Sequence, residues 1–266
     1  MSQFLRDESL RNLTLSEEAL RKINENILEI AKQVNDAFPR EVNDVSLNKK
    51  LLMPSYIIRF DNKGFRLFDF QAAIKYFNDA HKIERFIFYL DSLESIESNK
   101  MLGKSIELKF APNEPHNSNL VIQDDDNNWV DATFWKLKER LNKYQNKNYL
   151  IRNRWIPFFV QILGVVAGFI GSLWLAIKIS PKLTIENSVA FTFIIAFLLF
   201  SNIWGFVFER IIKSINYFWP NISFQEKKGI HWLIRALIST ALVSIFLYLL
   251  SRIFAYVGII FKSIIK

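Results

Sequence analysis

The spacing of apolar and polar residues divides the chain near residue 150. Before this point, short alternating or amphipathic segments predict a water-soluble fold. After it, apolar runs of about 20 residues match the thickness of a bilayer core. We therefore expect a soluble domain over residues 1–150 and a helical membrane domain over residues 151–266.

The first long element is a predicted helix over residues 15–38. Its apolar residues recur at spacings of three and four, Thr14 and Glu17 fit a capping box at its start, and Pro39 ends it. The repeat forms a heptad seam of Leu20, Ile23, Ile27, Ile30 and Val34. Because the heptads are few, we expect the seam to pack on the core of its own domain, and a short coiled coil between chains is the alternative.

Short β-prone segments fill the rest of the first half. They predict about five strands between residues 55 and 123, with a turn at 61–64 and a helix over 69–80. A further amphipathic helix is expected over residues 127–148. The alternation at 105–110 indicates a sheet with one wet face, so the expected fold class is α+β, or mixed α/β, with a mostly antiparallel sheet.

Two segments of the second half, at about 157–177 and 189–208, contain no charged residue and are expected to form two antiparallel spanning helices. An interfacial helix is expected over about 208–219, where apolar and basic residues alternate until Pro220. Small residues at Gly164, Gly168 and Gly171 fit close helix packing within the chain or in a homo-oligomer, and the alternative is the general abundance of glycine in membrane helices.

A third apolar stretch, at 230–261, is broken by Arg235 and Arg252. We expect one span at about 230–251 followed by an amphipathic tail over 253–266, while a re-entrant or interfacial segment remains open. A shifted placement would put Arg252 near the bilayer centre, where it would be a functional charge. Asn202 is a second polar candidate inside a span.

The charge balance changes at the same boundary. The whole chain has a net charge of +8, to which residues 1–150 contribute −1 and residues 151–266 contribute +9. The positive charges flank apolar runs, which favours a lipid bilayer over nucleic acid as the partner. The expected interface anchors are Arg152, Arg154, Trp155, Arg210, Lys213, Trp219, Lys227, Lys228, Trp232 and Arg235.

Lysine and arginine are more frequent before the first span and after the second than in the loop between them. The positive-inside rule then predicts a multi-pass protein of the inner membrane, with its N-terminal domain in the cytoplasm.

Candidate catalytic chemistry is sparse. The chain has no cysteine, its first half has only Gly64 and Gly103, and the three histidines lack metal-ligand spacing. We therefore expect no enzymatic activity and no cofactor. Asp124, Asp125 and Asp126 offer oxygen atoms to a metal ion, but capping of the next helix explains them better.

The layout suggests a cytoplasmic sensor or interaction domain, responding to a protein partner or small ligand and coupled to a small helical bundle. In layout alone it resembles membrane-disrupting effectors of bacterial antiviral systems, although no residue motif carries the resemblance. That resemblance implies a pore-forming effector in antiviral defence. The alternative is an anchored scaffold that presents an interaction domain at the inner membrane face.

Overall fold

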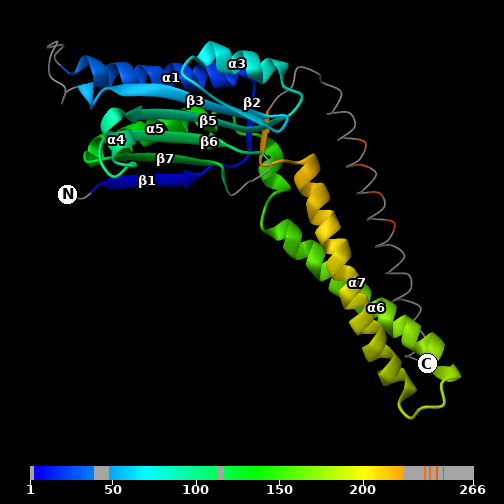
Figure 1. Ribbon diagram of the computed structural model, residues 1–266. Helices are drawn as coiled ribbons and strands as arrows, with labels where there is room; N and C mark the ends of the chain where they lie inside the picture. The colour runs from blue at the N-terminus through cyan, green and yellow to red at the C-terminus, as the bar shows by residue number, and fades with distance from the viewer. Residues whose placement is uncertain are drawn as a thin grey trace. The chain divides into compact units, whose positions relative to one another are not determined.

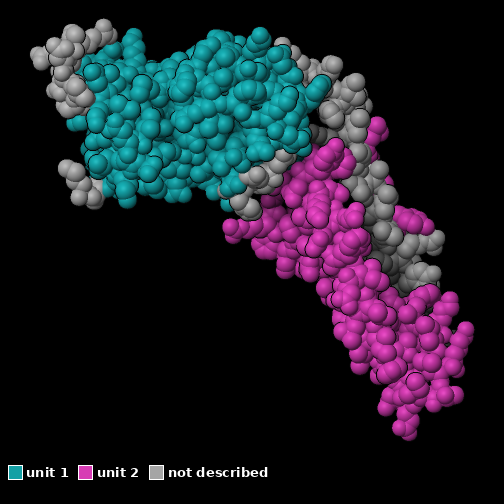
Figure 2. Space-filling view, in the orientation of Figure 1, with its two compact units in different colours: residues 1–149, 220–226 teal, residues 150–219, 227–266 magenta. Residues whose placement is uncertain are grey.

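The computed structural model describes residues 3–38, 48–112 and 117–224, together with Leu237, Thr240, Ser244 and Tyr248. The chain divides into two compact units (Figure 2). Unit 1 comprises Met1–Tyr149 and Pro220–Glu226, and unit 2 comprises Leu150–Trp219 and Lys227–Lys266. The expected third span at 230–251, the tail at 253–266 and Arg252 lie outside the described residues.

Unit 1 is built on an antiparallel sheet (Figure 1). Within the described residues this sheet has six strands in the order β1-β7-β6-β5-β3-β4. Their bounds are β1 Phe4–Ser9, β3 Leu52–Phe60, β4 Lys63–Leu67, β5 Ile83–Ser92, β6 Ser105–Phe110 and β7 Asn119–Asp124. The expected α+β class with an antiparallel sheet is confirmed.

A two-residue turn joins β3 to β4 inside the predicted turn at 61–64. Asp61 and Asn62 have positive φ angles of 47° and 63°, and Phe60 pairs with Lys63. Such turns match the right-handed twist of the strands, and Asp and Asn tolerate the left-handed conformation that they need.

Helix α1 (Glu17–Asp36) begins two residues later than expected. Its N-cap is Ser16, whose Oγ accepts a hydrogen bond from the amide of Ala19 at 3.1 Å. The predicted capping box at Thr14 is wrong because Thr14 lies in strand β2 (Leu13–Leu15), where its amide donates to the carbonyl of Tyr144.

The heptad seam of α1 packs inside unit 1. Leu20, Ile23, Ile27 and Ile30 are buried in the core, and Val34 packs against it partly buried. Tyr56 on β3 donates to Asn24 Oδ1 at 2.7 Å, which ties the helix to the sheet. The same side chains would be needed for a coiled coil, so the structure uses the seam for the domain core.

Two further helices, α3 (Phe70–Asp79) and α5 (Asn127–Asn142), lie on the same face of the sheet as α1. Their apolar residues join alternate strand residues in one core. Asp69 caps α3, accepting from the amides of Gln71 and Ala72, and Asp126 caps α5, accepting from the amide of Asn128. Shorter helices are α4 (Leu93–Glu97) and the 3-10 helix η2 (Lys147–Leu150).

Three strands were not predicted: β1, β2 and β8 (Ile222–Phe224). Strand β8 pairs in parallel with β2, and Ile222 is completely buried in the core of unit 1. This strand follows the two long apolar helices in sequence. Unit 1 is therefore discontinuous, and residues 220–224 belong to it although they lie within the range expected for the membrane domain.

Unit 2 contains a helical hairpin of α6 (Trp155–Ile179) and α7 (Ser188–Phe218), joined through the 3-10 helix η3 (Ser180–Lys182). Both long helices are long and apolar enough to cross a membrane. With 31 residues α7 extends about 46 Å, more than a bilayer core of about 30 Å. The expected interfacial helix at 208–219 is therefore the last third of a continuous helix.

Candidate functional site

The packing face of the hairpin consists of small residues on α6. Gly164, Gly168, Ser172 and Ala176 are buried at intervals of four. A Cβ atom at Gly164 would overlap with the indole ring of Trp204, and one at Gly168 with the ring of Phe200. Both glycines therefore serve packing within the chain, whereas Gly171 is exposed and no described residue lies near its Cβ position.

The opposite faces of the hairpin helices are apolar and exposed. In the most apolar 18-residue stretch of α7, only 6% of the residues are buried. In the corresponding stretch of residues 147–182, which contain α6, 22% are buried. A core helix of a soluble protein would be mostly buried, so the low burial distinguishes these two helices from core helices. Asn202 is also exposed.

The two ends of the hairpin are held together within unit 2. The Nη1 atom of Arg152 donates to the carbonyl oxygen of Trp219 at 2.9 Å. Two expected interface anchors are thus joined at the base of the hairpin. Among the other anchors, Lys213 lies 3.8 Å from Glu209, Arg210 stacks on Phe206, and Arg154 and Trp155 are exposed. Lys227, Lys228, Trp232 and Arg235 lie outside the described residues.

A junction network in unit 1 surrounds the points where the chain leaves for the hairpin and returns. It consists of Asn12, Thr14, Asn146, Asn148, Asn221 and Ser223. Asn221 is buried, and its Oδ1 accepts from the amide of Asn12 at 2.9 Å while its Nδ2 donates to the carbonyl of Leu10 at 3.1 Å.

The outgoing segment joins the same network. Asn146 donates through Nδ2 to Thr14 Oγ1 at 3.1 Å, and Thr14 Oγ1 lies 2.9 Å from Ser223 Oγ. Asn148 Nδ2 donates to the carbonyl oxygen of Pro220 at 3.0 Å, which links the two crossing points directly. Sequence reasoning missed this site because residues 209 positions apart meet in it, although the run of asparagines at 142–148 was a visible signal.

The acidic run at 124–126 has structural partners. Asp124 is buried and forms an ion pair with Lys104, whose Nζ lies 4.3 Å from the ring centre of Trp129. Asp126 is the expected helix cap. In the part of the chain that the structure describes, no group of three metal-binding side chains could hold an ion.

A second polar cluster lies on the sheet face away from the helices. Asp91 on β5 is buried and accepts a hydrogen bond from Ser105 Oγ at 2.6 Å. Burial raises the pKa of Asp91 above its ordinary value, and the hydrogen bond from Ser105 only partly opposes this. Burial also raises the pKa of the neighbouring Tyr89, whose ring lies 4.8 Å from Lys100 Nζ.

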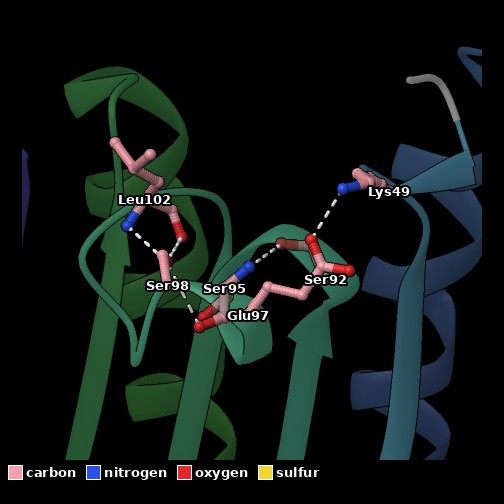
Figure 3. A network of polar contacts seen from close by, with 6 residues as sticks. All are labelled: Lys49, Ser92, Ser95, Glu97, Ser98 and Leu102. Atoms are coloured by element: carbon pink, nitrogen blue, oxygen red, sulfur yellow. Dashed lines mark hydrogen bonds and ion pairs between the residues drawn. The ribbon is translucent and has the colours of Figure 1, made fainter.

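The loop beside this cluster is held by its own polar contacts (Figure 3). Ser92 caps α4 by accepting from the amide of Ser95, and Glu97 pairs with Lys49 at 2.8 Å. Ser98 Oγ accepts from the amide of Leu102 and donates to its carbonyl. These contacts account for the shape of the loop, so we assign the cluster a structural role.

Comparison with protein-family models, with curated proteins and with solved structures found no match for this chain. The hairpin and the junction network are the features from which we infer a function.

Proposed function

We propose that this protein is a non-enzymatic membrane protein in which a cytoplasmic domain responds to a ligand or partner and transmits its state to a membrane-inserted helical hairpin. The observation that carries this proposal is the insertion of the hairpin between two parts of one folded unit. The chain leaves unit 1 after Tyr149 and returns at Pro220.

Tethering at both ends favours coupling. A single flexible tether would let a folded domain and its anchor move independently. Here both crossing points are hydrogen-bonded within the same junction network, of which Asn221 is buried, and β8 places Ile222 in the core of unit 1. A change in unit 1 that moves β2 or β8 would act on the hairpin through both connections.

The charge distribution supports the proposed orientation. Four basic residues lie just before α6: Lys143, Lys147, Arg152 and Arg154. Arg210 and Lys213 lie in the last part of α7. The tip of the hairpin carries two, Lys178 in the last turn of α6 and Lys182 in η3. Under the positive-inside rule, unit 1 faces the cytoplasm and the hairpin tip faces outward.

The proposed output is a change in membrane permeability. Induced expression should lower the membrane potential reported by a potential-sensitive dye, and Asn221→Ala should alter this response by removing two side-chain hydrogen bonds at the junction. Asn78→Ala is the control, since it removes an exposed hydrogen bond on α3. If expression of the wild-type protein leaves membrane potential and dye exclusion unchanged under every condition tried, the permeability function is wrong.

The alternative is a membrane-anchored scaffold. Replacement of residues 150–219 by an unrelated two-helix hairpin distinguishes the two functions. A scaffold would keep its partner binding after this replacement, because any membrane anchor would serve. A coupled protein would lose its effect on membrane permeability, because that effect depends on this hairpin.

A further inference from the structure

A cavity of about 620 Å³ opens in unit 1 beside the junction network. One wall is β1 with the segment leading to β2, and the other is the second half of α5 with residues 145–149. Its volume falls in the range of about 300–1,000 Å³ that is typical of small-molecule sites.

The deeper lining is apolar. Leu10, Leu13, Leu120, Phe134 and Leu141 line the cavity and are buried. Tyr149, which is 57% exposed, adds an aromatic ring at the edge. The cavity therefore offers contact to an apolar face of a ligand.

The charged groups of the lining balance one another. Lys138 Nζ lies 2.6 Å from Glu8 Oε2, and the remaining charged residues are Asp7 and Arg11. A charged ligand would meet no excess of the opposite charge, so the lining favours an uncharged ligand.

Four amide side chains provide the polar part of the lining: Asn12, Asn142, Gln145 and Asn146. Gln145 donates a hydrogen bond to Asn142. The side chain of Asn146 donates to Thr14 Oγ1 and accepts from the amide of Asn148. Among the described residues, Asn12 is different, since its Oδ1 is shielded from water and has no hydrogen-bond partner. An unpaired buried amide oxygen is destabilising, and a turn of the side-chain amide toward the cavity would let a ligand hydroxyl pair with it.

The backbone of Asn12 is held firmly. Its φ angle is 57°, its amide donates to Asn221, and its carbonyl accepts from Asn146 at 2.7 Å. A half-turn of the side-chain amide about χ2 exchanges its oxygen and nitrogen, so either group can face the cavity. Hydroxyl groups, which both donate and accept, complement such an amide in either orientation.

We propose that this cavity binds an uncharged glycoside, whose sugar hydroxyls pair with Asn12 and the neighbouring amides and whose apolar portion rests on the leucine lining. Three lining residues, Asn12, Asn146 and Tyr149, lie at or beside the crossing points of the chain. Occupancy therefore acts on the hairpin, a consequence that rests on the proposed function, whereas binding itself does not.

The test titrates full-length protein in detergent with phenyl β-glucoside and with adenosine by isothermal calorimetry. We expect saturable binding of at least one probe with a Kd below about 1 mM. Asn12→Gly should weaken it about tenfold or more, since glycine keeps the positive φ angle and removes only the amide. Asn62→Gly, at a positive φ angle in the β3–β4 turn, should bind like the wild type.

Two results would overturn the site: no saturable binding of either probe, or equal affinity of the Asn12→Gly variant and the wild type. A second measurement tests whether occupancy of the cavity acts on the hairpin. It compares the rate of maleimide labelling of the Leu150→Cys variant with and without the bound probe. Binding with a changed labelling rate supports both claims. Binding with an unchanged rate supports the site and contradicts the proposed coupling.

Discussion

At the scale of single residues, the packing of the hairpin depends on two glycines, because a residue without a side chain leaves room for an aromatic ring from the other helix. Gly164 and Gly168 let the rings of Trp204 and Phe200 approach the backbone of α6. In lipid, where apolar burial gives little driving force between helices, such close packing is a main source of helix association. Gly171, only three residues beyond Gly168, is not part of this contact.

Gly164→Ala should therefore destabilise the hairpin by about 1–3 kcal/mol, because the added methyl group overlaps with the Trp204 ring. Gly171→Ala is the matched control and should leave stability unchanged or raise it by up to about 1 kcal/mol through helix propensity. Unfolding of the full-length protein in mixed detergent micelles measures both. Equal effects of the two substitutions would contradict the packing assignment.

Asp91 gives a prediction about pH. Burial raises the pKa of Asp91 above 3.8, so the folded protein binds this proton more tightly than the unfolded chain. The resulting stabilisation is fully present below pH 3.8 and is lost as pH rises through the raised pKa. Asp91→Asn should thus be more stable than the wild type at neutral pH, by a margin that disappears in acid.

Urea denaturation of the full-length protein at several pH values tests this expectation. Asp125→Asn, which changes an exposed residue beyond β7, is the control and should show no such trend. A difference between Asp91→Asn and the wild type that is constant with pH would contradict the assignment.

At the scale of elements, the short strand β8 is the feature with the largest consequence. It has three residues, yet it pairs with β2 and delivers Ile222 to the core and Phe224 to its edge. An isolated three-residue strand has no stability of its own, so it exists because the rest of unit 1 receives it.

Ile222→Ala should destabilise unit 1 by about 2–5 kcal/mol, because it leaves a cavity in the core. Ile96→Ala on α4 is the matched control, since Ile96 is 47% exposed, and it should cost less than about 1 kcal/mol. Chemical denaturation followed by tryptophan fluorescence measures both. Equal costs would mean that β8 does not contribute to the core.

At the scale of the whole molecule, one folded unit carries the hairpin as an insertion. Asn148 Nδ2 donates a hydrogen bond to the carbonyl oxygen of Pro220 at 3.0 Å. The residues of unit 1 that precede and follow the inserted hairpin therefore lie side by side. A short Gly/Ser linker of about five residues should therefore replace residues 150–219 without strain.

A chain with this replacement, ended after Glu226, should fold and remain soluble without detergent, whereas the full-length protein should partition into membranes. Size-exclusion chromatography and circular dichroism test the first expectation, and resistance to carbonate extraction tests the second. The Ile222→Ala version of the shortened chain is the control and should lose stability. Aggregation of the shortened chain itself would contradict the independence of unit 1.

The proposed orientation can be tested cleanly because the chain has no cysteine. In intact cells, a membrane-impermeant maleimide should label Glu186→Cys, near the hairpin tip, and should label Asp125→Cys only after lysis. The reverse pattern would contradict the cytoplasmic placement of unit 1.

Sequence periodicity alone predicted the elements whose environment repeats along the chain. Local patterns are present in the seam of α1, in strands β3 to β7 and in the two long helices. In the first two the pattern comes from one buried face, and in the long helices from apolar residues on all sides. The α+β class and the antiparallel sheet followed from these patterns. The glycine spacing indicated a packing face but not its partners, Trp204 and Phe200.

Only the tertiary structure decided where the chain closes on itself. Strands β1, β2 and β8 are too short or too polar to show a period, and Asn12 meets Asn221 across 209 positions. Contacts between residues so far apart arise from the packing of the whole fold, which no local pattern records. The discontinuity of unit 1, the junction network and the cavity beside it all depend on such contacts.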